Sequence, residues 1–303
     1  MQPEEEQGQE SRCGFVAIIG APNAGKSTLV NKLVGAKISI VSHKVQTTRA
    51  RIRAIYMNGL SQVILVDTPG IFKPRRKLDE AMVGNAWGGA NDADAVVLLV
   101  DARRGMDEEV AAIVANFKAQ GIKAILVINK IDLIPAERLL PLSQELNEAY
   151  PFVESFMVSA LTGSGVEKLG ERLAALMPKG NWLYPEDQTA DVHLRFIAAE
   201  ITREKIYERL HEELPYASTV ETETWEERKD GSVKIQQAIF VAREGQKAIV
   251  LGKGGQQIKL LGQLARAEME ESFGRKVHLF LFVKVRENWA DDPERLRMMG
   301  LEL

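Results

Sequence analysis

Eight consecutive residues near the start of the chain form a pattern that binds phosphate. The loop is Gly20, Ala21, Pro22, Asn23, Ala24, Gly25, Lys26 and Ser27, with Thr28 following. Two glycines let the backbone curl so that successive N–H groups point inward at phosphate oxygens. Lys26 is expected to reach the β- and γ-phosphates, and the Ser27 hydroxyl is the expected ligand of Mg²⁺. The loop lies between an apolar run, 15–19, and a helical pattern, which is the context that such a loop requires.

A second motif, Asp67-Thr68-Pro69-Gly70, directly follows the strand-like run 62–66. Asp67 is predicted to hold magnesium through water, and the N–H of Gly70 to sense a γ-phosphate and release it after hydrolysis. Thr68 and Pro69 complete the turn and are predicted to border the nucleotide.

A third motif, Asn129-Lys130-Ile131-Asp132, ends another apolar run. The two acceptor oxygens of Asp132 match the ring N–H and exocyclic amine of guanine, whereas adenine presents a ring acceptor. A buried polar group left without its partner discriminates by factors of about 10⁴ to 10⁵. The motif therefore predicts GTP rather than ATP. Asn129 is expected to orient the base edge and the loop, and the methylenes of Lys130 to cover a face of the base.

A fourth motif consists of Ser159, Ala160 and Leu161, where the N–H of Ala160 is predicted to meet the guanine carbonyl. Between the first two motifs, the polar segment 42–49 lacks periodicity. A threonine of this segment is predicted to close onto magnesium when the γ-phosphate is present; Thr48 is the first choice and Thr47 the alternative. The candidate catalytic residues are Lys26, Thr48 and Gly70, and the candidate metal ligands are Ser27, Thr48 and Asp67.

Apolar runs alternate with helical patterns from residue 14 to residue 177. The predicted strands are 15–19, 63–66, 95–100, 123–128 and 152–158, and the predicted helices begin near Lys26, Lys77, Asp107, Ala136 and Val166. This alternation predicts an α/β domain in which helices cover both faces of a mostly parallel sheet. Ligands bind beyond the carboxyl ends of such strands, and all four motifs lie at those ends.

The pattern breaks at Pro178-Lys179-Gly180, and the polar composition that follows predicts a linker over 179–190. Beyond it, the order helix, strand, strand, helix, helix, strand predicts an α+β domain over 191–290. Leu194, Ile197 and Ile201 mark one face of its first helix, and Lys229-Asp230-Gly231 predicts a turn between its first two strands.

A glycine loop, Gly252-Lys253-Gly254-Gly255, separates two short helices of this domain. Such a loop leaves room for a nucleic-acid backbone against the helix N–H groups, and Lys253 adds charge. Single-stranded RNA fits this arrangement. The candidate RNA-binding residues are Val250, Gly252, Lys253, Gly254, Gly255, Ile258 and Lys259. A basic neighbourhood is formed by Lys247, Lys253, Lys259, Arg266, Arg275 and Lys276.

Composition and length limit the class of protein. The chain has 303 residues, 45% of them apolar, and a formal net charge of -3, so it is long enough for two globular domains and carries no global sign of nucleic-acid binding. A single cysteine, Cys13, cannot form an internal disulfide and favours a reducing cytoplasm. Residues 1–12 are predicted to form a disordered leader rather than a targeting peptide, and 291–303 a C-terminal tail.

Four motifs together resemble those of the translation-factor-related GTPases, and of the Era family in particular. They are Gly-x-Pro-Asn-x-Gly-Lys-Ser, Gln-Thr-Thr-Arg, Asp-Thr-Pro-Gly and Asn-Lys-Ile-Asp. The resemblance spans residues 13–285. It implies a P-loop GTPase domain over 13–178 followed by a type II KH domain. It also implies a Mg²⁺-dependent GTPase that binds the 3′ region of 16S rRNA and assists assembly and maturation of the 30S ribosomal subunit. A monomer in the cytoplasm, partly peripheral at the inner membrane, is expected.

One position departs from the pattern of Ras-like proteins, which carry a water-orienting glutamine after the Asp-x-x-Gly motif. Here the residue is Ile71, so we expect slow intrinsic hydrolysis with catalytic help from elsewhere. Related GTPases that lack this glutamine and carry asparagine where Asn23 stands use potassium, so the resemblance implies potassium stimulation. Two alternatives are an RNA-binding scaffold whose nucleotide only supports the fold, and a P-loop kinase, against which Asp132 argues.

Overall fold

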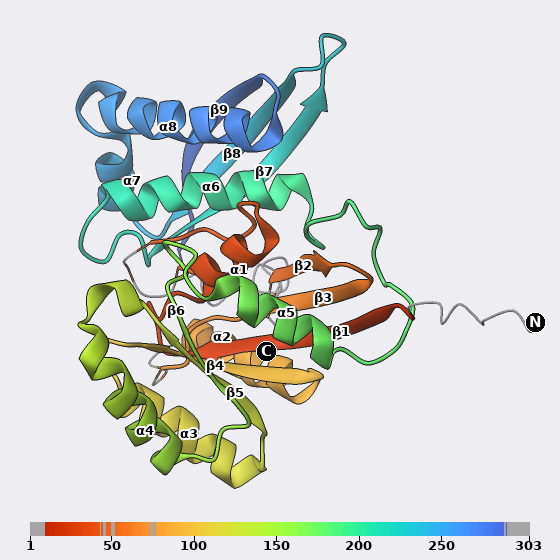
Figure 1. The fold of residues 1–303 in the computed structure, drawn as a ribbon. Coiled ribbons are helices and arrows are strands. Elements are labelled where there is room, and N and C mark those ends of the chain that lie inside the picture. The colour runs from red at the N-terminus through yellow and green to blue at the C-terminus, as the bar shows by residue number, and fades with distance from the viewer. Residues whose placement is uncertain are drawn as a thin grey trace, which may run out of the picture. The chain divides into compact units, whose positions relative to one another are not determined.

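The computed structural model describes residues 10–42, 44, 47–49, 52–72, 74, 77–287 and 289 (Figure 1). Two compact units account for these residues. The first comprises Met1–Ala36, Ile52–Phe72 and Ala86–Asp191, and the second comprises Lys37–Arg51, Lys73–Asn85 and Val192–Leu303. Most of the predicted leader, residues 1–9, and the predicted tail, 291–303, lie outside the described residues.

A six-stranded sheet forms the centre of the first unit, in the order β2-β3-β1-β4-β5-β6. The parallel strands are β1 (Arg12–Gly20), β3 (Ser61–Asp67), β4 (Ala95–Asp101), β5 (Ala124–Asn129) and β6 (Ser155–Val158). The predicted mostly parallel sheet is confirmed. The prediction of a strand from residue 152 was wrong at its start, because Phe152 N donates to Tyr150 O (2.9 Å) in a tight turn before β6.

Strand β2 (Ile52–Asn58) pairs antiparallel with β3 and was not predicted. Its residues Ile52 and Ala54 are buried and Arg53 is exposed. Asn58 pairs with Ser61, so the two-residue turn of the hairpin is Gly59-Leu60, and Gly59 has φ 55°. A glycine at the first position of a two-residue turn between strand-like runs is a local signal for a hairpin. That signal was available in the sequence.

Helices cover both faces of this sheet. Helices α1 (Lys26–Val34) and α5 (Val166–Leu176) contact each other and β2 and β3 on one face. The other face packs on α3 (Glu108–Gln120), α4 (Leu139–Ala149) and the part of α2 (Lys77–Asn91) that begins at Ala86. Successive side chains of a strand point to opposite faces of the sheet. Ala17 and Ile19 of β1 therefore lie on the same face as Leu98 and Leu126, and all four belong to the core under α3 and α4. The helix predicted near Ala136 begins as a 3₁₀ turn, Ala136–Arg138.

The segment predicted as a linker lies along the strands of the first unit. Gly180 N donates to Ser11 O (3.0 Å), and Trp182 Nε1 donates to Leu60 O (2.9 Å). At its end, Asp191 N donates to Arg53 O (2.9 Å). The segment predicted as a linker, together with Asp191, therefore belongs to the first unit.

The second unit packs three helices on a three-stranded sheet of order β7-β8-β9. Its elements are α6 (Leu194–Arg209), β7 (Ser218–Glu227), β8 (Val233–Val241), α7 (Glu244–Leu251), α8 (Gln256–Phe273) and β9 (Val277–Val285). Strand β8 is antiparallel to β7 and parallel to β9. The predicted order of six elements is confirmed.

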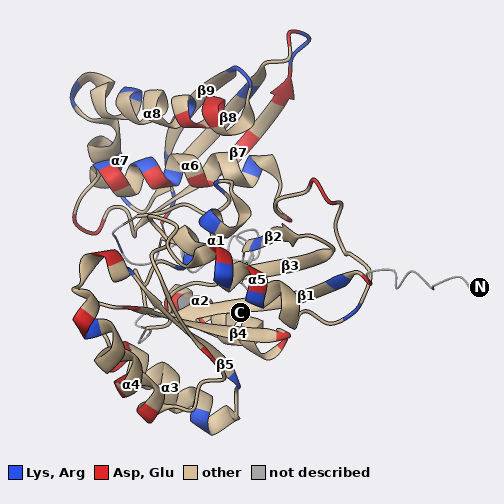
Figure 2. Ribbon diagram, viewed as in Figure 1, with Lys and Arg blue, Asp and Glu red and all other residues tan. Residues whose placement is uncertain are grey.

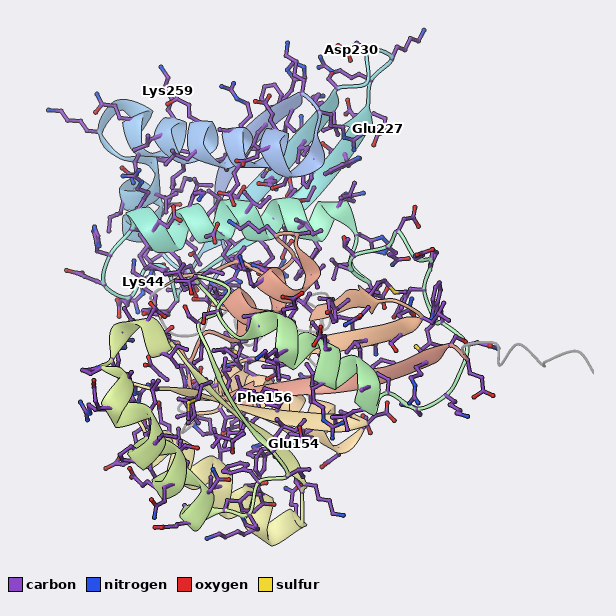
Figure 3. The ribbon with its side chains drawn as sticks, in the orientation of Figure 1. Lys44, Glu154, Phe156, Glu227, Asp230 and Lys259 are labelled. Atoms are coloured by element: carbon purple, nitrogen blue, oxygen red, sulfur yellow. The ribbon has the colours of Figure 1, made fainter. Side chains whose placement is uncertain are left out.

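The predicted turn and helix face of this unit have different outcomes. Asp230 lies at the tip of the β7–β8 hairpin, as Figure 3 shows, and Gly231 there has φ 79°. On α6, Ile201 is buried in the core and Ile197 packs against it. Leu194 was wrongly placed on the buried face, because it is the first residue of the helix and is 46% exposed. No helix of the described residues has the length and apolar composition to cross a membrane.

Candidate nucleotide and RNA sites

The phosphate loop joins the end of β1 to α1 and requires glycine at two positions. Gly25 has φ 100°, and a Cβ there would lie 2.3 Å from Asn129 Nδ2. A Cβ on Gly20 would lie 2.5 Å from Leu99 O. Asn23 also has a positive φ, 61°, which costs energy for a residue with a side chain and is often found at functional sites.

Lys26 folds back onto its own loop. Its Nζ donates to Gly20 O (3.0 Å) and Ala21 O (2.9 Å), and the residue is 6% exposed. Burial lowers the pKa of Lys26 to about 8, although the Asp67 carboxylate opposes this shift. Because the charge is desolvated among neutral carbonyl oxygens, a polyphosphate entering the loop would strongly favour the ammonium form.

The first two motifs meet at the side chains of Ser27 and Asp67. Ser27 Oγ donates to Asp67 Oδ2 (2.7 Å), and Thr68 Oγ1 donates to Ile18 O (2.7 Å), which fixes the turn after β3. A hydroxyl and a carboxylate at hydrogen-bonding distance are hard oxygen donors that fit Mg²⁺. Such an ion, when bound, neutralises charge on the phosphate oxygens. Thus Ser27 and Asp67, as predicted, are brought together.

Gly70 lies directly against the phosphate loop. A Cβ at this position would be 2.8 Å from Pro22 Cα, so only glycine permits the approach. The next residue, Ile71, donates its N–H to Gly20 O (3.1 Å), and its side chain is buried in the core. Both hydrogen bonding and packing therefore hold the second motif beside the first.

Asn129 connects the phosphate loop to the fourth motif. Its Nδ2 donates to Ala24 O (2.8 Å), and its Oδ1 accepts from Ala160 N (2.9 Å). Asn129 and Ala160 are buried, whereas Asp132 is exposed in the 3₁₀ turn Ile131–Leu133. This leaves the Asp132 carboxylate open to a ligand.

Other members of the third and fourth motifs border the same region. Lys130 has φ 64°, Ser159 is fully buried and Leu161 is 76% exposed.

Asp101, at the end of β4, is a site residue that the sequence reasoning missed. Its Oδ2 accepts from Lys130 Nζ (2.7 Å), and its Oδ1 accepts from Arg103 N (3.0 Å) and Nε (3.1 Å). Burial would raise the pKa of Asp101, but the hydrogen bonds from Arg103 and Lys130 outweigh it and lower the pKa to about 2. The available signal was an acid directly after the buried run 95–100, at the edge of the sheet where the motifs lie.

Thr48 lies in the segment Lys37–Arg51, which belongs to the second unit. Arg49 Nη1 donates to Ser218 O (2.9 Å) and Nη2 to Tyr207 Oη (3.0 Å), and Arg203 Nη2 donates to Thr47 O. Arg49 is 2% exposed and Thr48 9%. The residues predicted to respond to nucleotide are therefore held by α6 and by the start of β7, an attachment that no sequence pattern indicated.

Lys44, labelled in Figure 3, supplies a second attachment of this segment. Its Nζ donates to the carbonyl oxygens of Tyr207 and Leu210, at the end of α6. A cation at the C-terminus of a helix is also favoured by the helix dipole.

The glycine loop of the second unit is open on its outer side. Gly252, Gly254 and Gly255 have φ of 71°, 62° and 76°, and a Cβ on either of the last two would meet no atom within 4 Å. Lys253 is exposed, and Lys259 projects outward from α8 (Figure 3).

The two apolar candidates beside this loop differ in burial. Ile258 is half-buried. The prediction that Val250 binds RNA is wrong. Val250 has no exposed surface and packs in the core, so its side chain cannot contact RNA.

The predicted basic neighbourhood is partly neutralised. Arg275 forms an ion pair with Glu227 (2.7 Å), and Lys247 lies 3.6 Å from Glu244. Figure 2 shows acidic residues on β7 as well as basic residues on α8. Within the described ranges, no ion pair involves Lys253, Lys259, Arg266 or Lys276. Of these four, Lys253 lies on the glycine loop and Lys259 near the start of α8, so these two lysines are the best placed for a phosphate at the loop.

Two family models match the chain. A 50S ribosome-binding GTPase model matches residues 15–130, and a KH domain model matches residues 213–290. The first match covers the phosphate loop through Lys130, and the second covers the glycine loop.

Relatives and solved structures match over nearly the whole length. GTPase Era of Afipia carboxidovorans is 62% identical over 98% of this chain and 97% of its own length, and that of Brucella suis is 59% identical over 98% and 96%. The crystal structure of a variant of Aquifex aeolicus Era bound to GDP·AlF4⁻ has a TM-score of 0.91 at 39% identity, covering 96% of this chain and 100% of that one. A crystal structure of Era with MgGDPNP and nucleotides 1506–1542 of 16S ribosomal RNA also gives 0.91 at 39% identity, covering 97% and 100%.

Proposed function

The chain belongs to the Era family of GTPases, and we propose that it is a Mg²⁺-dependent switch that binds the 3′ region of 16S rRNA through its KH domain. In this role it assists assembly and maturation of the 30S subunit. The solved Era that holds MgGDPNP and nucleotides 1506–1542 of 16S rRNA supports both the metal and the RNA.

The proposal that the chain binds a guanine nucleotide depends on two hydrogen bonds of the Asn129 side chain. Its Nδ2 donates to Ala24 O, and its Oδ1 accepts from Ala160 N. One side chain thereby fixes the phosphate loop relative to the guanine-reading motifs. With Asp132 exposed nearby in the chain, a guanine nucleotide has its phosphates and its base edge recognised by one preformed site.

Hydrolysis is expected to be slow without help. Water attacks the γ-phosphate in line, and Lys26, the loop N–H groups and magnesium stabilise the charge that develops. The side chain of Ile71 is aliphatic and buried in the core, so it cannot polarise the attacking water. We propose potassium as one source of help, bound beside the exposed Asn23. Equal turnover in potassium and sodium at saturating magnesium would refute that role.

Nucleotide state is proposed to bias RNA affinity through the segment that carries Thr48. Ligand-induced ordering of this segment changes the contacts of Arg49 and Lys44, which are made to α6 and to the start of β7 in the RNA-binding unit. GTP is expected to favour RNA capture, and hydrolysis to permit release. We propose that the chain acts as a monomer in the cytoplasm and is partly peripheral at the inner membrane.

The decisive experiment measures nucleotide specificity and RNA binding together. In calorimetry, wild-type protein should bind GDP and not ADP, and Asp132→Asn should shift the preference towards xanthosine nucleotides. Anisotropy with labelled RNA of nucleotides 1506–1542 should show tighter binding with a GTP analogue than with GDP. Unchanged base preference in Asp132→Asn would refute the base site. A Lys26→Ala protein that still completes 30S maturation in cells would favour the scaffold alternative.

A further inference from the structure

One lysine side chain joins three strand ends around the nucleotide site. Lys130 Nζ donates to the backbone oxygen of Asn23, in the phosphate loop, and to Asp101 Oδ2 (2.7 Å), at the end of β4. The stem of Lys130 runs beside the same loop, since a Cβ on Gly25 would lie 3.8 Å from Lys130 Cε. The third motif is therefore bonded to the phosphate loop by Lys130 as well as by Asn129.

Both ends of the hydrogen bond between Lys130 and Asn23 have left-handed backbone. Asn23 has φ 61° and Lys130 has φ 64°, values that a residue with a Cβ adopts only at a cost in energy. Such conformations persist where surrounding contacts fix them, and they cluster at functional sites. A hydrogen bond that joins two of them is expected to belong to the preformed nucleotide site.

We propose that Asp101 is a positioning residue of this site, which holds the Lys130 ammonium on Asn23 O and thereby fixes the phosphate loop for a guanine nucleotide. The role rests on the proposed guanine-nucleotide site and adds to it a residue outside the four motifs. Asp101 is the register partner of Asn129, the residue before Lys130, so the paired ends of β4 and β5 place the carboxylate beside the third motif.

The charge and burial of Asp101 suit it to this role. Its side chain is 4% exposed, and that of Lys130 is 22% exposed. A lysine stem is long and flexible, so a neutral carbonyl alone leaves the ammonium free to turn towards water, whereas an ionised carboxylate adds a stronger, charge-assisted hydrogen bond. Burial would raise the pKa of Asp101, but hydrogen bonds from Arg103 and Lys130 lower it to about 2, so the carboxylate is ionised at neutral pH.

Arg103 fixes the carboxylate in the orientation that Lys130 meets. Asp101 Oδ1 accepts from Arg103 N (3.0 Å) and Nε (3.1 Å), and Oδ2 accepts from Arg103 Nη2 (2.7 Å) as well as from Lys130 Nζ. Asparagine at position 101 would keep the size of the side chain but remove its negative charge and one acceptor oxygen.

Calorimetry of GDP binding by full-length variants measures the role of Asp101. Asp101→Asn is expected to weaken GDP binding about tenfold, the lower end of the range for losing a group that orients a ligand-binding side chain. Lys130→Met keeps an unbranched apolar stem and removes the ammonium, so it should weaken GDP binding by at least as much. The double variant should bind GDP within about twofold of Lys130→Met, because both changes break one linkage.

Asp94→Asn is the matched control. Asp94 and Asp101 flank β4 at its two ends, roughly 23 Å apart at about 3.3 Å per residue. Asp94 Oδ2 accepts from Phe15 N (2.8 Å), so this carboxylate also has a structural contact. Asp94→Asn changes an acid of the same strand far from the nucleotide site, and it should bind GDP within about twofold of wild type.

Steady-state hydrolysis of GTP separates positioning from a general loss of structure. An interaction made equally before and during the reaction changes KM and not kcat, and KM equals the Kd of GTP when chemistry is slow. Asp101→Asn should therefore raise KM about tenfold and leave kcat within about twofold. A lower kcat with unchanged KM, the result of partial unfolding, would overturn the positioning role.

Two further results would overturn the role of Asp101. One is GDP affinity of Asp101→Asn within twofold of wild type, and the other is a loss in the double variant equal to the product of the two single losses. If Asp101→Asn does not fold, Lys130→Met decides, since wild-type GDP affinity in that variant would overturn the linkage. Wild-type protein that binds no GDP would instead refute the proposed nucleotide site itself.

Discussion

Lys26 is predicted to destabilise the nucleotide-free protein even though the nucleotide site depends on it. Its pKa falls from the usual 10.5 to about 8 because the ammonium is buried, which corresponds to about 3 kcal/mol at neutral pH. Lys26→Met removes that cost. It also removes two hydrogen bonds, but Gly20 O still accepts from Ile71 N (3.1 Å) and Ala21 O from Ala24 N (3.3 Å). We therefore expect a net gain of about 1–2 kcal/mol in the free energy of unfolding, with each kcal/mol raising Tm by about 2–4 °C.

The pH dependence of this gain has a fixed sign. The folded pKa, about 8, lies below the unfolded value, 10.5, so the unfolded state binds more protons between these values and wild-type stability rises with pH across the window. The advantage of Lys26→Met should be complete below pH 8 and shrink towards pH 10.5. At about pH 9.5 the cost of the lysine falls to roughly 1.4 kcal/mol.

Scanning calorimetry of the nucleotide-free proteins at pH 7 and at high pH measures both effects. Ser27→Ala is the control, because it alters the adjacent residue and removes the hydrogen bond to Asp67 without removing a buried charge. Lys26→Met should lose binding of guanine nucleotides while it gains stability. A lower Tm for Lys26→Met at pH 7, or a gain that does not change with pH, would refute the reasoning.

Two further substitutions test the geometry of the site. Gly25→Ala should lower GDP affinity at least tenfold and stability by about 1–3 kcal/mol, since its Cβ would lie 2.3 Å from Asn129 Nδ2 at φ 100°. Calorimetry checks this against Gly59→Ala, which has a positive φ but no atom within 4 Å and should alter stability alone. Asp101→Asn should cost about 2 kcal/mol at pH 7, because the folded pKa of Asp101, about 2, lies below the usual 3.8. Urea unfolding should show that deficit shrinking as pH falls below 4 and nearly absent at pH 2; a deficit independent of pH would contradict the ionised contacts with Arg103 and Lys130.

The four motifs could be predicted from the sequence because each depends on local chemistry. Gly25, Lys26 and Ser27 lie within one turn of backbone, and their spacing alone defines a phosphate loop. The order of strands and helices followed from periodicity for the same reason. Beyond a local pattern the predictions failed: Leu194 fits a helical face by spacing, yet it is exposed where its helix begins, and Val250 flanks the loop in sequence but packs into the core.

The amino-acid sequence alone predicts the chemistry of the site, namely which groups are expected to hold phosphate, metal and guanine and where along the chain they lie. Which distant groups meet became visible only in the folded chain. Asp101 pairs with Lys130, and Arg49 is buried among backbone carbonyls that follow it by more than 160 residues. A pocket beside Gly252 likewise joins residues from separate helices and a connecting loop. Contacts of this kind depend on how whole elements pack, and a single sequence carries no local pattern that records them.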